Sequence, residues 1–398
     1  MKPVGWALIL LLAALPAWAA REITVGQLED LLRSLHQDKK SDAEVATALK
    51  QVQLTEELTV TTMNSLIRFV PGPLSTEQIY VLEARSADLI PPAADLPATP
   101  TPDAAAQHAI LARAANYVTK TFDQLPALTA TRTTLRFQDN VEAVAASSGI
   151  SGSARDVVTS PGFSNPAAFI HYINSSAAEV LSDHGAEKLP AEKEKIPWGA
   201  NKMIALEESD PSLGVVFREA QAAGTIQWLR WELVNGKQTA VYSFTVPKKK
   251  SRLAVNVCCF PKVSQAGIAT FYTATTAATL GGGASGGGVS GNFQTNTDWH
   301  NYKAAVPYHG EFFIDPNTGI IVRMITEAEL NPAEVVHQVD TRIDYGPVKV
   351  GDTMVVAPVK TIINTEVVPN GDSGAGRYST RRTLFTSEYK DYRPSDAK

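Results

Sequence analysis

Hydrophobic positions are unevenly spread along the chain, and the first twenty residues form one nearly continuous apolar run. A positive start at Lys2 precedes apolar residues 4–15, a break at Pro16 and the sequence Ala17-Trp18-Ala19. This order is typical of a secretory signal peptide, and the run is shorter than the roughly 20 residues that a membrane-spanning helix needs. We expect residues 1–20 to be a cleaved signal, with an uncleaved N-terminal anchor as the alternative.

From residue 21 to about residue 90, apolar residues recur at helical spacing. Thr24 and Ser41 each precede such a run and are followed three residues later by Gln or Glu, which is the capping-box signature of a helix start. A third helix is expected to end at Pro71-Gly72-Pro73, and a fourth to begin at Ser75. Helices this short are marginal alone, so the pattern predicts a small helical bundle over residues 21–90.

Five prolines separate this region from the rest of the chain. They lie within residues 91–102, with Ala and Thr between them. Such a composition is typical of an extended, semi-rigid linker and marks a domain boundary. An amphipathic helix is expected to follow from Ala104 to about Phe122, with Asp103 as its cap.

After this helix, the pattern changes to strands joined by turns. The expected strands cover residues 129–137, 169–173, 177–181, 225–233, 239–246, 253–260, 311–314, 320–324, 335–345, 354–367 and 378–389. Turns are expected at residues 174–176, at Asn235-Gly236 and at residues 315–319. Successive strands joined by turns pair antiparallel. Residues 103–398 are therefore predicted to form a large curved antiparallel sheet, an incomplete barrel, with a flexible Gly-rich loop at 264–297.

Composition agrees with a folded α+β protein of two domains. The chain has 398 residues, of which 44% are hydrophobic, and a formal net charge of −5. A mildly acidic chain lacks the clustered basic face that nucleic acid needs. The two cysteines, Cys258 and Cys259, are adjacent, and on a strand they point to opposite faces. Three alternatives remain open for them: two small hydrophobic side chains, a strained vicinal disulfide, or an intermolecular disulfide.

Several short motifs carry a resemblance to a known family. The motifs are Thr24-Val25-Gly26-Gln27-Leu28-Glu29, Ser41-Asp42-Ala43-Glu44-Val45-Ala46, Leu125-Pro126, Trp228-x-x-Trp231, Val241-Tyr242-Ser243-Phe244, Tyr308-His309-Gly310-Glu311, Asp315-Pro316-x-Thr318-Gly319 and Tyr345-Gly346-Pro347-Val348. Together they resemble a family of uncharacterised exported proteins of Acidobacteria, over residues 23 to about 388. This resemblance implies a bacterial envelope or secreted protein and brings no known activity.

The layout of the C-terminal region is similar to a second family. A helix feeding a curved antiparallel sheet resembles the periplasmic lipoprotein-carrier (LolA-like) fold. That resemblance implies a half-barrel around an apolar cavity for acyl chains. It lies in the layout and not in a motif, so it assigns no lipid-binding residue and does not establish function.

No catalytic or metal site emerges from the residue pattern. Ser285 lies in a G-x-S-x-G match, but a nucleophile elbow requires a strand before it and a helix after it, whereas here the flanks are Gly-rich. His300, His309 and His337 lack the close spacing that is typical of zinc ligands. We therefore expect no catalytic residue, no metal and no cofactor.

The candidate ligand-binding residues are aromatic. Trp228 and Trp231 lie an odd number of residues apart on an expected strand, so we expect them on opposite faces, one in the core and the other on a concave surface. Phe312, on another expected strand, is the third candidate. Inward residues of these two strands would line the cavity of the half-barrel.

Charged runs leave further alternatives open. Lys248-Lys249-Lys250 either touches an anionic surface or forms a solvated turn, and clusters of four or more cations are typical of lipid-headgroup binding. The acid groups at 207–210, and Glu327 with Glu329, are expected to be solvated, although paired carboxylates can also perform acid–base chemistry.

These observations favour a periplasmic or secreted, non-catalytic binding protein with a lipid or another apolar or amphipathic ligand in the half-barrel. A structural or protein-docking envelope protein is the alternative, with the helical bundle as docking surface; it predicts an exposed apolar patch on Leu31, Leu35 and Leu49. A hydrolase that uses Ser285 or a histidine is the second alternative. We expect no nucleic-acid partner and no membrane span after signal cleavage.

Overall fold

The structure is a computed structural model, and it describes residues 21–139, 170–183, 186–188, 205–206, 212–261, 299–331, 334, 336–367 and 381–395. The chain divides into two compact units, Met1–Pro92 and Ala93–Lys398. The division lies inside the proline-rich segment. None of the helices in the described ranges is long and apolar enough to cross a membrane.

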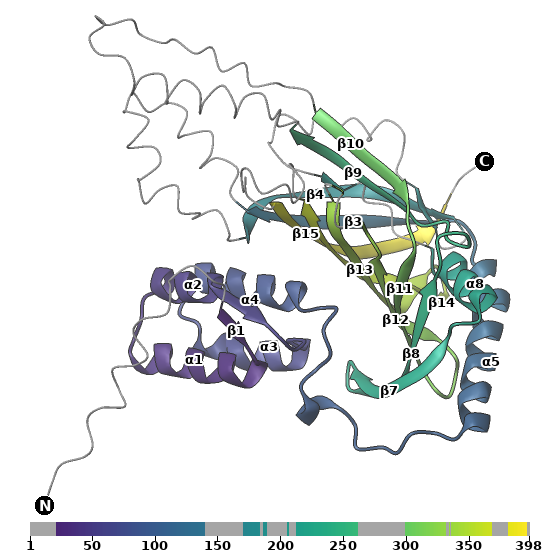
Figure 1. The fold of residues 1–398 in the computed structure, drawn as a ribbon, viewed down its shortest axis with the longest axis horizontal. Helices are drawn as coiled ribbons and strands as arrows, with labels where there is room; N and C mark the ends of the chain where they lie inside the picture. Colours follow the sequence, from purple (N-terminus) through teal and green to yellow (C-terminus); the bar gives the residue numbers. More distant parts are fainter. Residues whose placement is uncertain are drawn as a thin grey trace, which may run out of the picture. The chain divides into compact units, whose positions relative to one another are not determined.

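In its described part, the first unit combines helices with a short parallel pair of strands (Figure 1). The elements are β1 (Arg21–Ile23), α1 (Val25–Gln37), α2 (Asp42–Lys50), β2 (Val52–Leu54), α3 (Val60–Leu66) and α4 (Pro73–Arg85). Their apolar side chains form one buried cluster that includes Leu28, Leu49 and Leu82. The sequence pattern predicts the helices but not β1 and β2, because three-residue strands are too short to show a period of two.

Local capping signals fix two of these helix starts. The Thr24 side chain accepts a hydrogen bond from the backbone N–H of Gln27, whose side chain accepts one from Thr24 N–H, and Ser41 and Glu44 repeat the arrangement. The fourth helix begins at Pro73 and not at Ser75 as predicted. Its first N–H groups are capped by Asp42 of α2, which accepts from the backbone N–H of Ser75 at 2.8 Å and from that of Leu74.

The second unit is built on an open ten-stranded sheet in which all neighbouring strands are antiparallel. The strand order is β5-β4-β3-β15-β14-β13-β12-β11-β8-β7. The bounds are β3 (Leu128–Asp139), β4 (Ile170–Asp183), β5 (Ala186–Lys188), β7 (Gln227–Val234), β8 (Lys237–Val246), β11 (Tyr308–Ile314), β12 (Ile321–Ala328), β13 (Val336–Val350), β14 (Thr353–Val367) and β15 (Arg381–Pro394). The predicted α+β class and large antiparallel sheet are confirmed.

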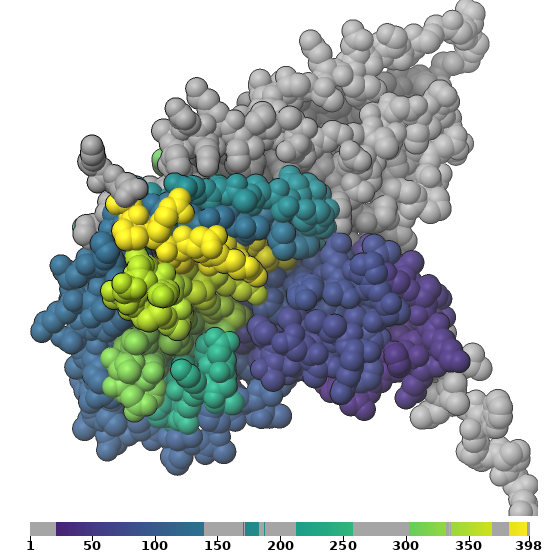
Figure 2. All heavy atoms as spheres, turned by 180° about the vertical axis from the view of Figure 1, so that it is seen from behind, coloured from purple at the N-terminus to yellow at the C-terminus, as the bar shows by residue number. Residues whose placement is uncertain are grey.

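Strands far apart in the sequence lie side by side in this sheet. Figure 2 shows the C-terminal strand β15, in yellow, between the blue and teal residues of β3 and β4 and the yellow-green residues of β13 and β14. A second sheet has the order β10-β9-β6, with β6 (Ala205–Leu206), β9 (Ala254–Pro261) and β10 (Trp299–Ala305). Val255 and Val257 of β9 share a buried cluster with Phe385 of β15, so this small sheet packs on the large one.

The prediction of a turn at residues 174–176 is wrong. Strand β4 runs unbroken through these residues and pairs with β3 on both sides of them. The pairing register shifts by one residue between Arg136 and Phe137, which indicates a β-bulge. Small polar residues such as Asn174 and Ser175 are common in turns, and here the ladder with β3 overrides that local preference.

Helices α5 (Ala104–Lys120) and α8 (Leu213–Ala223) pack against one face of the large sheet (Figure 1). The first was predicted. The second was not, although Leu213, Val216, Phe217 and Ala220 follow the helical i, i+3, i+4, i+7 spacing. Gly224 ends α8 in the left-handed conformation with a φ of 72°.

The turn between β11 and β12 docks on α5. Both Nε and Nη2 of Arg113 donate to the carbonyl oxygen of Pro316, at 3.0 and 2.7 Å. Gly319 has a φ of 77°, and a Cβ there would lie 2.4 Å from the carbonyl carbon of Arg113. Only glycine satisfies both the backbone conformation and this close approach.

We expect Gly319→Ala to reduce the free energy of unfolding by roughly 3 kcal/mol, because alanine is strained at positive φ and collides with α5. Gly351→Ala is the matched control, since Gly351 has a φ of 59° with open space around it. The control should cost about 1 kcal/mol. Urea unfolding of both variants gives the comparison, and equal costs would show that the contact with α5 is unimportant.

Candidate functional site

Trp228 and Trp231 lie on the same face of the sheet, and the prediction that they occupy opposite faces is wrong. A β-bulge in β7 shifts its register with β8 between Trp228 and Arg230, which inserts one residue into the alternation. The two indole rings are 4.9 Å apart between centroids in an edge-to-face contact. Trp228 also meets the ring of Tyr242 at 5.5 Å.

This aromatic pair holds part of the chain's own proline-rich segment. The Nε1–H group of Trp231 donates to the carbonyl oxygen of Pro100 at 2.8 Å. Next to it, the Thr99 hydroxyl donates to Gln238 Oε1 at 3.2 Å. Aromatic-lined grooves recognise proline-rich segments in a similar way.

Phe312 is fully buried between the sheet and α8. Its ring stacks on Phe244 at 4.3 Å and contacts Phe217 of α8 at 5.3 Å. Phe312 pairs in register with Tyr242, which pairs in turn with Trp228, so the three predicted residues share one face. Around Phe312 that face is filled by the aromatic side chains of the protein itself.

Several predicted features lie outside the described residues. These are Ser285 with the Gly-rich segment 264–297, the acidic residues 207–210, and the side chains of Cys258, Cys259 and His300. Among the side chains that are described, no group of three or more His, Cys, Asp or Glu residues could hold a metal ion.

The remaining two histidines of the zinc hypothesis lie apart and make different contacts. His309 of β11 lies between Glu327 of β12 and Glu329, which follows that strand. Its Nε2 lies 3.2 Å from Glu327 Oε2 and its Nδ1 lies 3.5 Å from Glu329 Oε1. The three side chains are partly exposed. His337 Nε2 lies 3.0 Å from the backbone oxygen of Glu334.

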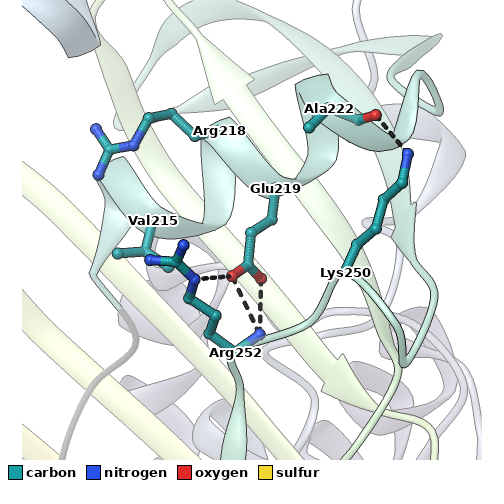
Figure 3. Close-up of a pocket in the computed structure, with 6 residues that line it drawn as sticks. All are labelled: Val215, Arg218, Glu219, Ala222, Lys250 and Arg252. Atoms are coloured by element: carbon teal, nitrogen blue, oxygen red, sulfur yellow. Dashed lines mark hydrogen bonds and ion pairs between the residues drawn. The ribbon is translucent and has the colours of Figure 1, made fainter.

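A pocket of about 420 Å³ lies beside α8, at the segment that joins β8 to β9 (Figure 3). It is lined by Val215, Arg218, Glu219, Ala222, Lys250 and Arg252. The first four come from one side of α8, and the other two come from the turn after β8. No sequence motif marks this pocket, because its lining residues meet only when α8 packs on the sheet.

Glu219 is the acidic residue among those that line the pocket. It is almost fully buried, and its two carboxylate oxygens accept hydrogen bonds from the backbone N–H of Arg252 at 3.1 and 3.2 Å. It also accepts the Tyr308 hydroxyl at 2.8 Å. Burial raises the pKa of Tyr308 well above its usual range, and the adjacent Glu219 carboxylate raises it further.

Three cations line the pocket, and each binds a different partner. Lys250 Nζ donates to the carbonyl oxygen of Ala222 at 2.6 Å, where a positive charge complements the C-terminal end of α8. Arg218 forms an ion pair with Asp123. The Arg252 guanidinium, which is largely exposed, lies 3.8 Å from Glu219. The lining therefore carries three positive charges and one negative charge beside the aliphatic groups of Val215 and Ala222.

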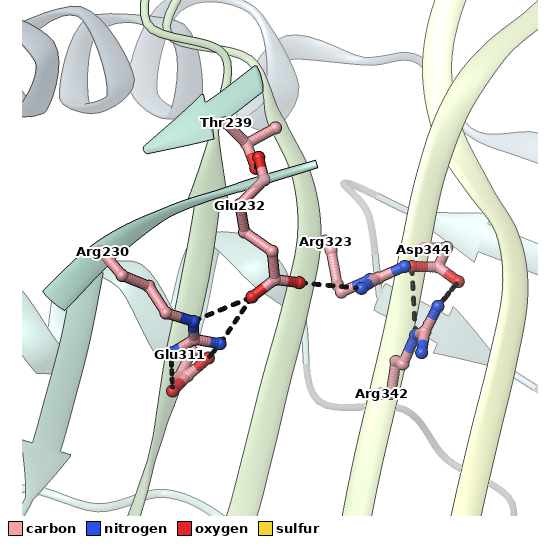
Figure 4. Close-up of polar contacts among 7 residues, drawn as sticks. All are labelled: Arg230, Glu232, Thr239, Glu311, Arg323, Arg342 and Asp344. Carbon is pink, nitrogen blue, oxygen red and sulfur yellow. Dashed lines mark hydrogen bonds and ion pairs between the residues drawn. The ribbon is translucent and has the colours of Figure 1, made fainter. Parts of the chain in front are cut away.

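The other face of the sheet carries an alternating row of charges (Figure 4). Its residues come from β7, β11, β12 and β13. Followed from contact to contact, they are Glu311, Arg230, Glu232, Arg323, Asp344 and Arg342. Each acid contacts at least one arginine, with distances from 2.6 to 3.7 Å. Because the charges neutralise one another, this row is a structural network and not an open binding site.

Asp344 lies between two arginines of the network. Burial alone would raise its pKa, but the guanidinium groups of Arg323 and Arg342 overcome this effect and hold the pKa well below its usual range. Glu232, which is 1% exposed, joins the two halves of the row. Burial lowers the pKa of Arg230, yet its bonds to Glu311 and Glu232 outweigh burial and raise the value overall.

No family model, no curated protein and no solved structure matches the chain. The assignment of function therefore depends on the geometry above.

We expect Trp231→Phe to loosen the proline-rich segment, because phenylalanine keeps the ring but cannot donate to Pro100. A neutral hydrogen bond contributes about 1 kcal/mol, so local opening should rise about fivefold. Elastase cleavage after Ala98 measures this opening. Leu233→Ala, at an exposed position of the same strand, is the control. Unchanged cleavage in Trp231→Phe would mean that the indole does not hold the segment.

We expect Asp344→Asn to destabilise the protein by about 3 kcal/mol near pH 7, because two buried guanidinium groups lose their partner. The pKa of Asp344 is lower in the folded chain, so the stabilisation is complete above the unfolded value of about 3.9 and is lost as pH falls below it. The gap between the wild-type protein and the variant in urea unfolding should be constant above about pH 5 and narrow below pH 4.

Lys390→Gln serves as the control for this network, because Lys390 forms an exposed ion pair with Glu388. Its cost should be below about 1 kcal/mol. If the wild-type protein and Asp344→Asn differ equally at all pH values, titration of the carboxyl does not contribute to stability.

Proposed function

We propose that this chain is an exported, non-catalytic binding protein for an anionic amphiphile, such as a fatty acid or an anionic lipid. The pocket beside α8 would hold the charged head of the ligand. One observation carries the proposal: an aliphatic wall and three cationic side chains line the same hollow. Export rests on the signal-like pattern of residues 1–20.

The size and chemistry of the pocket suit such a ligand. A volume of about 420 Å³ falls within the range of small-molecule sites, which combine apolar walls with a few well-placed polar groups. The carboxylate or phosphate of an amphiphile can accept charge-assisted hydrogen bonds from Arg252 and Arg218. Its apolar chain can lie along Val215 and Ala222.

This proposal keeps the predicted class of ligand but moves the binding site. In the LolA-like layout, an acyl chain lies inside the curved sheet. Here the face around Phe312 is covered by α5 and α8, with Phe217 in contact with the ring. An acyl chain could enter there only by displacing a packed aromatic core, whereas the rim of α8 is open.

The alternatives gain no specific support from the described residues. A docking role for the first unit predicts an exposed patch on Leu31, Leu35 and Leu49. Leu49 is 1% exposed, and the other two pack half-buried against the same core, so these residues do not form that patch. The hydrolase hypothesis depends on Ser285, which lies outside the described residues.

The test compares oleate with oleyl alcohol by isothermal titration, using the chain from Arg21 onward. We expect oleate to bind more tightly, and Arg252→Gln to weaken oleate about tenfold while leaving the alcohol unchanged, because a hydrogen bond to a charged group contributes about 1.5 kcal/mol or more. The substitution keeps the backbone N–H of residue 252, which holds Glu219.

Lys349→Gln is the matched control, since it removes one exposed positive charge elsewhere in the same unit. It should leave the affinity for oleate unchanged. Native mass spectrometry of the purified protein adds an independent readout, because an anionic lipid released by organic solvent would identify a natural ligand. Equal affinity for oleate and the alcohol, unaffected by Arg252→Gln, would refute the proposal.

A further inference from the structure

The turn that joins β8 to β9 gathers more positive charge than its lysine triplet alone. Lys248, Lys249 and Lys250 follow Pro247, and Arg252 comes two residues after the triplet. All four cationic residues are exposed. Arg218 of α8 lines the pocket together with Lys250 and Arg252, and its charge is balanced by Asp123.

Hydrogen bonds within the turn and from the turn to α8 fix its conformation. The backbone N–H groups of Lys250 and Ser251 both donate to the carbonyl oxygen of Pro247, at 2.9 and 3.2 Å. Glu219 binds the backbone of Arg252, and Lys250 binds the end of α8. These contacts hold the second half of the turn against the helix.

Lys248 and Lys249 are placed differently from the other two cations. Neither side chain forms an ion pair with a carboxylate of the described residues, and neither lines the pocket. Their charges do not contribute to any contact that stabilises the turn. They therefore remain available for an anionic partner outside the molecule.

We propose that this turn, residues 247–252, docks on the surface of an anionic lipid bilayer and brings the pocket beside α8 to the lipid headgroups. The inference deepens the proposed function and rests on it, because it makes the ligand of the pocket a lipid drawn from that membrane. Four cations within five residues reach the cluster size at which attraction to anionic lipid becomes appreciable.

A local cluster is sufficient even though the whole chain has a net charge of −5. Charges farther from the membrane than about 8 to 10 Å are screened at physiological ionic strength. Only the groups at the contact then count. Arg252 offsets Glu219 and Arg218 offsets Asp123, so the net positive charge at the turn comes from its three lysines.

The test measures cosedimentation of the chain from Arg21 onward with vesicles. One set contains phosphatidylglycerol mixed with phosphatidylcholine, and the other contains phosphatidylcholine alone. We expect binding to the anionic vesicles only, with a loss at high salt. Each lysine near the surface is worth about fivefold in affinity, so the double variant Lys248→Gln/Lys249→Gln should bind about 25-fold more weakly.

The double variant Lys237→Gln/Lys349→Gln is the control, because it removes the same charge from two exposed positions away from the turn. It should bind anionic vesicles as the unchanged chain does. Equal losses in both double variants would show that only net charge matters and would overturn the proposal. Equal binding to neutral and anionic vesicles would overturn it as well.

Titration with oleate separates this inference from the proposed function. Lys248→Gln/Lys249→Gln should keep its affinity for oleate, since neither residue lines the pocket. Arg252→Gln could weaken oleate binding while the lysine variant still binds anionic vesicles fully. That result would support the ligand site in the pocket and refute the membrane-docking surface. Alternatively, the lysine variant could fail to bind vesicles while no form of the protein binds oleate. That result would support the membrane-docking surface and refute the proposed ligand of the pocket.

Discussion

The candidate site depends on the contact between Phe217 of α8 and Phe312, whose ring stacks on Phe244. An antiparallel sheet with one apolar face must cover that face, and α5 and α8 provide the cover. Burying three aromatic rings also fixes the position and rotation of α8. Glu219 is thereby directed toward Tyr308 and the backbone of Arg252, so the helix organises the turn after β8.

The two faces of the sheet solve the burial problem in different ways. One face is apolar and covered by helices. The other buries charges, and it does so by alternating their signs across four strands, so that each acid contacts an arginine. Two guanidinium groups, those of Arg230 and Arg323, also lie over the ring of Phe313. Such a network contributes little net energy relative to an apolar core, but it penalises any register in which a charge would lose its partner.

The edge of the sheet shows how a local irregularity creates a contact. The bulge in β7 brings two indole rings to one face, and the proline-rich segment lies against them with a hydrogen bond from Trp231 to Pro100. The aromatic residues that we singled out as ligand-binding candidates thus contact the chain itself. The pocket, by contrast, is lined by six residues of a helix and a turn, and none of these six is aromatic.

The sequence by itself determined the features that depend on neighbouring residues. The capping boxes at Thr24 and Ser41, the helix after Asp103 and the hairpin turn at Asn235-Gly236, with positive φ at both residues, follow from local hydrogen bonds and backbone preferences. The alternation of apolar residues also predicted the antiparallel sheet and the α+β class.

Only the tertiary structure decided the features that depend on distant partners. Asp42 of α2 caps the start of α4, and pairing with β3 keeps β4 extended where a turn was predicted. A bulge places Trp228 and Trp231 on one face, although the sequence predicts opposite faces. The pocket also depends on distant partners, because Glu219 and Arg252 meet only after α8 has packed on the sheet. Local patterns report how a segment folds, whereas a site is formed by the packing of segments that are distant in the sequence.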